Sequence, residues 1–327
     1  MSYKRELLQA TLLGETTDHL PTSVWRHFYD FERTAERFSE AMLGFQKKFD
    51  WDFMKVNPRS QYHVEDWGTR YGYPDGNDQR PTRSLTPIKS VKDWGGIQLL
   101  NPLKGVLNEH LTSLNLIRKG LNGEVPFVMT IFTPLSIASR LVDSDETMLK
   151  YIRDYPKEIH AALNAITESF RAYIIECLNV GVDGIYLATT SWATYNLMTS
   201  PEYLEFGRNY DLRLLDAAKE CIFNILHVCK SNNMLTELAD YPVNAFSWDT
   251  TDPTNPTLEE MRKCTKSTLI GGINDHCLLS GKTNEIKAQV IDVLSQVERK
   301  RLMLGPGCSI PIDCPDSNLY TLREYPL

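Results

Sequence analysis

Three side chains in the second half of the chain have the chemistry of metal ligands: His227, Cys229 and Cys308. The first two stand in Leu-His-Val-Cys-Lys, which closes one apolar run, and the third stands in Gly-Pro-Gly-Cys-Ser, which closes another. Short apolar runs bounded by Gly and Pro are typical of buried strands. Residues two apart in a strand point to the same side, so His227 and Cys229 should project together. One imidazole and two thiolates are the donor set of a catalytic zinc site with an open fourth position.

Each of these residues also has a purely structural interpretation. A free cysteine is often a small buried apolar residue, and His227 could be a hydrogen-bonded histidine of the core. His276 and Cys277 are rival ligands, because they closely follow another predicted strand. Polar residues separate them from that strand, so we rank them lower and predict that His227, Cys229 and Cys308 bind Zn²⁺.

Composition argues against several classes of protein. The 327 residues carry a net charge of −7 and the isoelectric point is near 5.6, which is unfavourable for a nucleic-acid partner. No apolar stretch approaches the roughly 20 residues of a membrane span. The polar start of the chain has no apolar signal-peptide segment, and seven scattered cysteines suit a reducing compartment. We expect a cytoplasmic protein with no nucleic-acid and no membrane partner.

Strand-like apolar runs alternate with amphipathic helices, which is the pattern of parallel α/β proteins. We expect one domain over residues 1–327, built as a (β/α)8 TIM barrel with an N-terminal helical extension and a long loop insertion. The eight predicted strands are Ser23–Phe28, Trp51–Val56, Pro126–Phe132, Gly184–Thr189, Phe223–Val228, Ala245–Trp248, Thr268–Ile273 and Arg301–Leu304.

The predicted helices have clear boundary signals. Over Tyr155–Asn179 apolar residues recur at helical spacing, Pro156 suits the first turn and Gly181 lies just past the end. The sequence Thr257-Leu-Glu-Glu is a capping box that predicts the start of another helix. A further apolar stripe runs from Ile286 to Val297.

Residues Gly68–Ser84 interrupt this alternation with a run rich in Gly, Pro and charged residues. Long segments without regular structure inside compact domains are usually functional loops or disordered ones. Gly68–Ser84 is therefore either a lid at the entrance of a site or a solvated excursion.

In a TIM barrel the carboxyl ends of the strands face the active site. The predicted metal ligands end the fifth strand or follow the eighth, Asp249 ends the sixth and Asn274-Asp275 ends the seventh. We therefore expect these polar side chains to meet at one mouth. Asp249 and Asn274 either orient the metal ligands or the substrate, or are solvent-exposed polar residues.

Seven short segments together resemble the uroporphyrinogen decarboxylase superfamily over nearly the whole chain. Each is weak alone, but their order and spacing are fairly specific, and the resemblance implies a (β/α)8 barrel. The segments are Val24–Phe28, Phe49–Val56, Pro58–Tyr62, Val182–Tyr186, Phe246–Asp249, Gly271–Asn274 and Gly305–Cys308.

The superfamily has two branches with different chemistry. Its decarboxylases carry an Arg-rich segment of the type Arg-Gln-Ala-Gly-Arg, which Trp25–Asp30 of this chain lacks. Its cobamide-dependent methyltransferases bind zinc through His-x-Cys and a distant Cys, as His227, Cys229 and Cys308 would. One departure is Lys230, where many relatives carry Gly. The resemblance therefore implies a zinc-dependent methyltransferase.

Further residues are candidates for the site, Tyr186 from the resemblance and the others from their position and chemistry. Tyr186 matches a strand of the family and lines either the cavity or the core. Arg26 and His27 are placed to bind an anionic group of the substrate, although Arg26 could equally form a structural ion pair. Tyr62 and Trp67 would suit a flat apolar ligand, or simply pack loops.

No Asp-x-His-x-x-Gly corrinoid-binding motif occurs in the chain. A corrinoid would therefore arrive on a separate protein, and the other reactant would be a thiol or a small methoxylated or methylated compound. Two alternatives stay open: a metal-independent tetrapyrrole decarboxylase, and a barrel that only binds a tetrapyrrole or corrinoid. The sequence is also compatible with a homodimer.

Overall fold

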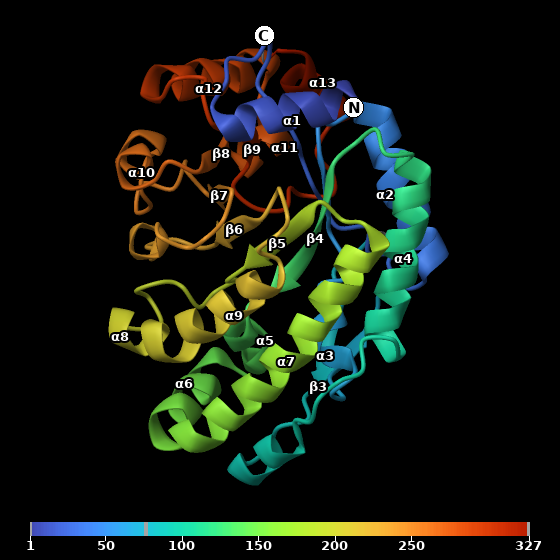
Figure 1. Ribbon diagram of the computed structural model, residues 1–327, viewed down its shortest axis with the longest axis vertical. Helices are drawn as coiled ribbons and strands as arrows, with labels where there is room; N and C mark the ends of the chain where they lie inside the picture. Colours follow the sequence, from blue (N-terminus) through green and yellow to red (C-terminus); the bar gives the residue numbers. More distant parts are fainter. Residues whose placement is uncertain (1, 75–77, 326–327) are drawn as a thin grey trace.

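The centre of the molecule is a curled sheet of parallel strands (Figure 1). The computed structural model describes residues 2–74 and 78–325. Within these residues the sheet has seven strands in the order β1-β4-β5-β6-β7-β8-β9. Their bounds are Met54–Val56 (β1), Phe127–Phe132 (β4), Gly184–Ala188 (β5), Ile225–Val228 (β6), Ala245–Trp248 (β7), Thr268–Ile273 (β8) and Leu302–Pro306 (β9).

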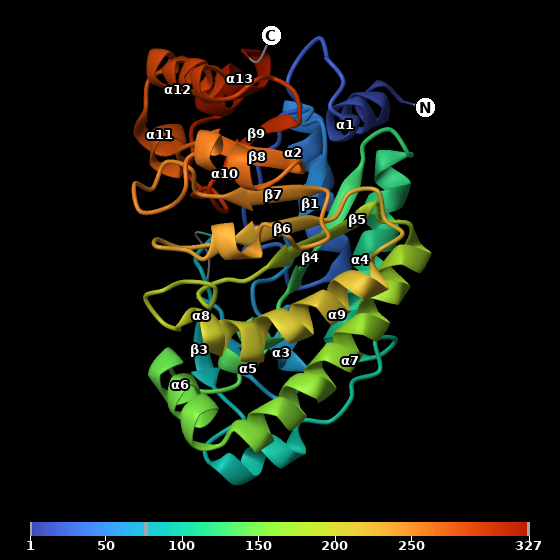
Figure 2. The same ribbon diagram turned by 60° about the vertical axis from the view of Figure 1, so that its left-hand side comes forward.

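Helices pack around the sheet, and α2, α4, α7 and α9 contact one another in that order (Figures 1 and 2). No helix in the described part of the chain combines the length and apolar character that a membrane crossing needs. The α-helices are α1 (Tyr3–Leu13), α2 (Ala35–Phe49), α3 (Tyr62–Glu65), α4 (Gly105–Leu121), α5 (Pro134–Ser139), α6 (Asp145–Asp154), α7 (Pro156–Val180), α8 (Ser200–Tyr203), α9 (Asn209–Ala217), α10 (Leu258–Cys264), α11 (Asp275–Ser280), α12 (Thr283–Gln296) and α13 (Asp316–Glu324). Val91–Gly96 (η1) and Leu235–Leu238 (η3) are 3₁₀ turns, and Leu204–Arg208 (η2) is a π-helical turn.

The two faces of the sheet bury different apolar clusters. Side chains alternate along each strand, so in β5 Ile185 and Leu187 join the outer cluster under the helices, whereas Tyr186 and Ala188 join the inner one. The inner cluster also takes Val128, Ile225, Ala245, Ile270 and Met303 from the other strands. The inner face is thus filled by side chains of the strands together with Leu8 of α1, Trp25, Phe53 and Phe223.

The predicted strand Ser23–Phe28 is wrong, because the described residues of this segment form no regular strand. The segment does lie beside both edges of the sheet: Thr22 forms an isolated parallel bridge with Leu304, and the Thr22 carbonyl accepts from the Asp52 N–H. Toward the residues before β1, two side-chain hydrogen bonds take the place of backbone hydrogen bonds that a regular strand would form. The Asp52 carboxylate takes the Thr22 N–H at 2.8 Å, and the Ser23 hydroxyl donates to the Phe53 carbonyl at 2.6 Å.

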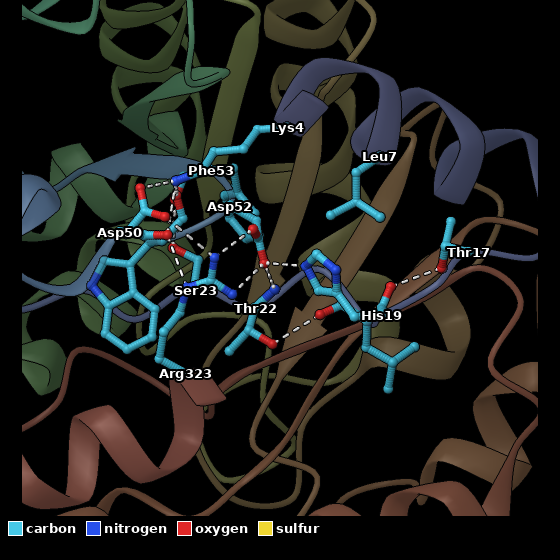
Figure 3. A network of polar contacts seen from close by, with 12 residues as sticks. Lys4, Leu7, Thr17, His19, Thr22, Ser23, Asp50, Asp52, Phe53 and Arg323 are labelled. Carbon is cyan, nitrogen blue, oxygen red and sulfur yellow. Dashed lines mark hydrogen bonds and ion pairs between the residues drawn. The ribbon is translucent and has the colours of Figure 1, made fainter. Parts of the chain in front are cut away.

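A network of polar contacts around Asp52 fixes this segment (Figure 3). The buried carboxylate also lies 3.2 Å from His19 Nε2 and 3.2 Å from an Arg323 guanidinium nitrogen of α13. Lys4 of α1 donates to the carbonyls of Asp50 and Trp51, both at 2.8 Å. The two ends of the chain are thereby tied to the start of β1.

The helix predictions are confirmed by the observed boundaries. Helix α7 has Pro156 in its first turn and ends at Gly181, whose φ of 104° only glycine adopts readily. Thr257 and Glu260 form the expected capping box of α10, and α12 buries Ile286, Val290 and Val293. The N-terminal helical extension is α1.

The segment Gly68–Ser84 is more ordered at its ends than predicted. Arg70–Gly72 (β2) and Thr82–Leu85 (β3) pair as antiparallel strands, while residues 75–77 lie outside the described part of the chain. An ion pair of 2.8 Å joins Asp78 to Arg26, and Arg83 donates to carbonyls of Arg140 and Asp143 beyond the carboxyl end of β4. The segment therefore lies on the carboxyl-end side of the sheet.

Candidate functional site

His227, Cys229 and Cys308 meet at the carboxyl ends of β6 and β9. His227 is buried in β6, Cys229 directly follows that strand and is half-buried, and Cys308 lies just past β9 and is exposed. The ligand atoms of the three residues all lie within 4.8 Å of one another. No other group of three His, Cys, Asp or Glu residues in the described chain meets this condition, so His276 and Cys277 form no such cluster.

The distances suit a tetrahedral metal ion. The Cys229 and Cys308 sulfur atoms are 4.0 Å apart. Two thiolates bound to one tetrahedral zinc at about 2.3 Å would be about 3.8 Å apart. The donor set and its spacing therefore fit zinc with little movement, and the exposed side of Cys308 leaves room for a further ligand.

Strand pairing fixes the imidazole. His227 lies opposite Ser247 of β7, and its Nδ1 lies 3.1 Å from the Ser247 carbonyl oxygen. Because a carbonyl only accepts, Nδ1 carries the proton and Nε2 keeps its lone pair. The Tyr186 ring stacks on the imidazole at 5.2 Å between centroids, and its hydroxyl lies 3.3 Å from Ser247 Oγ. Tyr186 thus packs the face of the ligand rather than standing free in the mouth.

The two thiols differ in acidity. The hydrogen bond from Cys229 and the neighbouring His227 lower the pKa of Cys308 well below its usual value. Hydrogen bonding to Cys308 and burial raise the pKa of Cys229.

The loop that carries Cys308 packs closely against the end of β7. A Cβ atom added at Gly307 would lie 2.7 Å from Asp249 Cβ, so only glycine fits there. The Asp275 carboxylate lies near this loop, where backbone N–H groups of Gly307 and Cys308 favour its charged form, although its Oδ1 atom is buried without a hydrogen-bond partner among the described residues. Burial, with the negative charges of Cys308 and Asp249, raises the pKa of Asp275 to about 8.

Asp249 and Asn274 meet through one threonine. Asp249 Oδ1 accepts from the Thr251 N–H and hydroxyl, and Asn274 Nδ2 donates to the same hydroxyl at 2.8 Å. Asn274 also caps α11 through the Cys277 N–H. These two side chains thus order the loops beside the cluster, and Asp275, expected at the same mouth, lies near the loop that carries Cys308.

Lys230 adopts a backbone conformation that favours glycine. Its φ is 77°, in the left-handed region that side chains other than glycine populate at a cost. This accounts for the Gly expected at the equivalent place in related sequences. The chain turns sharply here, immediately after Cys229.

Arg26 and His27 have partners within the protein. The Arg26 guanidinium pairs with Asp78 at 2.8 Å and donates to the Ile312 carbonyl, so the structure realises the ion-pair alternative. His27 stacks on Tyr29 and its Nδ1 lies 3.6 Å from the fully buried Glu32. Arg26 thus contacts the loop Gly68–Ser84 through Asp78. The contacts described for Arg26 and His27 do not include His227, Cys229 or Cys308.

Tyr62 and Trp67 lie elsewhere. Tyr62 is fully buried in the outer apolar cluster, and its hydroxyl donates to the Thr130 carbonyl at 2.8 Å. Trp67 packs against the same cluster, and its indole N–H donates to the Gln98 carbonyl. Both aromatic rings pack the protein, so the structure does not bring them to the cluster.

The polar pair Lys55 and Asn57, at the carboxyl end of β1, was not predicted. Lys55 Nζ lies 4.6 Å from the centre of the Tyr186 ring, which itself stacks on His227. The available signal was a lysine inside the apolar run Trp51–Val56, where a buried charge requires an explanation.

Comparison with known proteins decides the family. The model of the family "Uroporphyrinogen decarboxylase (URO-D)" matches residues 4–325. The chain belongs to the uroporphyrinogen decarboxylase family. A uroporphyrinogen decarboxylase of Hydrogenovibrio crunogenus is 28% identical over 138 residues, which are 41% of this chain and 38% of that protein. One of Christiangramia forsetii is 24% identical over 98% of this chain and 99% of its own length. The chain thus spans only 38% of the length of the first of these relatives.

Solved structures share the fold. A methyltransferase from Methanosarcina mazei superposes with a TM-score of 0.84 over 98% of this chain and 97% of its own, at 20% identity. A B12-independent methionine synthase from a Shewanella species superposes with a TM-score of 0.64 over 93% of this chain and 96% of its own, at 13% identity. At such identities the likeness concerns the fold, and the activity must be argued from the site.

Proposed function

We propose that this protein is a zinc-dependent methyltransferase that moves a methyl group between a corrinoid protein and a thiol or a small methoxylated or methylated compound. The observation that carries the proposal is the cluster of His227, Cys229 and Cys308, whose ligand atoms lie within 4.8 Å of one another. The fold shared with a methyltransferase from Methanosarcina mazei supports it.

The roles of the residues follow from their contacts. His227 would bind through Nε2, because Nδ1 is held by the Ser247 carbonyl, and Cys229 and Cys308 would bind through sulfur. Zinc held there would activate the group at its open position, either by lowering the pKa of a thiol or by polarising a methylated leaving group. Asp275 would favour the position of the Cys308 loop through electrostatic attraction to the backbone N–H groups of Gly307 and Cys308.

The methyl-carrying corrinoid would come with a second protein, since the chain has no corrinoid-binding motif of its own. The rim that it would meet includes the loop Gly68–Ser84, which the pair of Arg26 and Asp78 fixes on the carboxyl-end side of the sheet. The exposed position of Cys308 suits approach from that side.

The second candidate is a tetrapyrrole decarboxylase. The curated relatives named above favour it, since each is a uroporphyrinogen decarboxylase, one of them over 98% of this chain. Two features speak against it: the segment Trp25–Asp30 lacks the Arg-rich pattern of those enzymes, and Arg26 is already paired with Asp78.

One experiment separates the two. The purified protein, with and without zinc, is incubated with methylcobalamin and a simple thiol, and in parallel with uroporphyrinogen. We expect loss of methylcobalamin and formation of the methyl thioether only with zinc, and no release of carbon dioxide. Decarboxylation that does not depend on metal, with no methyl transfer, would overturn the proposal in favour of the second candidate.

A further inference from the structure

A buried ammonium group without a carboxylate partner lies beside the metal cluster. Lys55 is 5% exposed, and no described carboxylate forms an ion pair with it. Its Nζ lies over the rings of Tyr186 and Trp25, at 4.6 Å and 5.6 Å from their centres. Burying a charge is costly unless something else interacts with it, and the neighbouring Cys308 and Cys229 favour the charged form only in part, since burial remains the larger effect. The two aromatic faces supply part of this stabilisation, and an anion would supply the rest.

Asn57 provides a second donor at the same place. Residues two apart in a strand share a side, and Lys55 Nζ donates to Asn57 Oδ1. The Ser309 hydroxyl donates to the same oxygen at 3.4 Å. Because an ammonium group only donates, the amide atom that faces Lys55 must be Oδ1. The Nδ2 atom of Asn57 is therefore on the side of the amide that Lys55 does not occupy. That Nδ2 is buried and has no hydrogen-bond partner, so it is a donor in need of an acceptor.

These donors belong to the same region as the proposed ligands. Ser309 directly follows Cys308, and the Tyr186 ring contacts both the Lys55 ammonium and the His227 imidazole. A small molecule bound at the metal through one end could therefore present its other end to Lys55. Burial lowers the pKa of Lys55 to about 7, and an adjoining anion would favour its charged form.

We infer that Lys55 and Asn57 form a binding site for the carboxylate of the small-molecule reactant, so that the thiol or methylated substrate of the proposed reaction is a carboxylic acid. The carboxylate accepts from the Lys55 ammonium in place of Asn57 Oδ1 and from Asn57 Nδ2. This inference rests on the proposed function in one respect: the thiol or methylated end of the substrate is taken to lie at the proposed metal site.

The test uses two thiols that differ only in the charged group, 3-mercaptopropionate and 1-propanethiol, with the full-length zinc-loaded protein. Calorimetry should show that 3-mercaptopropionate binds tighter by about tenfold or more, as expected for hydrogen bonds to a charged group. Lys55→Met should abolish this preference, so that 3-mercaptopropionate binds this variant no more tightly than 1-propanethiol. Lys266→Met, at an exposed lysine, should keep the preference of the wild type.

A second variant guards against poor folding of the first. Asn57→Asp keeps the ammonium but gives it a permanent carboxylate partner, so this variant should also lose the preference for 3-mercaptopropionate. Equal affinity of the wild type for the two thiols, or an undiminished preference in both variants, would overturn the inference.

A further measurement distinguishes failure of the proposed metal-dependent reaction from failure of the carboxylate site. If neither thiol changes the visible spectrum of the cobalt(II)-loaded protein, thiol activation at the metal fails. Propionate binding to the wild type but not to Lys55→Met would then still support the carboxylate site. If propionate also fails to bind the wild type, the inference is overturned as well.

Discussion

The Nδ1 atom of His227 lies 3.1 Å from the carbonyl oxygen of Ser247, its partner on the neighbouring strand. The contact is part of the register of β6 and β7, so the sheet itself sets the orientation of the imidazole. Because this contact is to the backbone, the His227 imidazole would already be oriented before any metal ion binds. Pre-orientation of this kind raises metal affinity, and it makes the ligand set directly testable.

We expect Cys308→Ala to lose zinc while keeping its fold, because Cys308 is exposed and contributes little to the core. Elemental analysis should find about one zinc per wild-type chain and almost none in the variant. Cys264→Ala is the matched control, since Cys264 is also exposed and lies on α10. Full zinc content in Cys308→Ala would mean that another residue completes the site.

Asp78→Ala should free the loop Gly68–Ser84 from the rim by removing the 2.8 Å ion pair with Arg26. We expect the KM for the corrinoid protein to rise several-fold while the zinc content stays unchanged. Limited proteolysis should also cut faster within the loop. Asp292→Ala, at an exposed position of α12, is the control. An unchanged KM despite faster cleavage would show that the loop does not contribute to binding of the corrinoid protein.

Asp211 should make the stability of the protein depend on pH. Its carboxyl is fully buried, and burial raises its pKa to about 7 although the hydroxyls of Tyr203 and Tyr241 donate to it. The unfolded chain ionises this group near pH 4. The folded state therefore binds more protons between about pH 4 and 7, and stability falls as pH rises through this range.

Asp211→Asn should flatten this part of the profile, measured as the free energy of unfolding in urea at several pH values. The difference of about three pKa units corresponds to roughly 4 kcal/mol lost by the wild type between pH 4 and 7, as an order of magnitude. A wild-type profile as flat as that of the variant would contradict the assignment.

Lys230→Gly should stabilise the protein by about 1 kcal/mol, because Lys230 has a φ of 77° and glycine removes the steric cost of that conformation. Urea unfolding provides the measurement. Lys266→Gly is the contrasting variant: Lys266 is exposed and has an ordinary φ, so the added chain freedom should lower its stability. A destabilised Lys230→Gly would show that the lysine side chain itself stabilises the turn.

Local signals in the sequence were sufficient for much of the fold. Helix α7 begins at a proline and ends at a glycine with positive φ, and α10 begins at a capping box, so each boundary is set within a few residues of itself. The proximity of His227 and Cys229 could also be predicted, because residues two apart in a strand point to the same side wherever that strand lies in the sheet.

Features that depend on distant partners could not be predicted in the same way. Ser23–Phe28 has the composition of a strand, but the Asp52 carboxylate takes the Thr22 N–H that a regular ladder would use. Tyr62 was expected near a ligand, yet its hydroxyl is bound by the Thr130 carbonyl. Asp275 was expected at the mouth from its place after the seventh strand, but its proximity to the backbone N–H groups of Gly307 and Cys308 depends on a distant loop.

The bridge between Thr22 and Leu304 joins segments from opposite ends of the chain. Contacts of such long sequence separation form late in folding, because a very long loop must close before they can contribute. Cys308 lies shortly beyond Leu304, so during synthesis a chain can present His227 and Cys229 well before the third ligand emerges from the ribosome. Binding of the proposed metal ion would therefore depend on completion of the sheet, and a translation product truncated after β8 would lack both the last strand and Cys308.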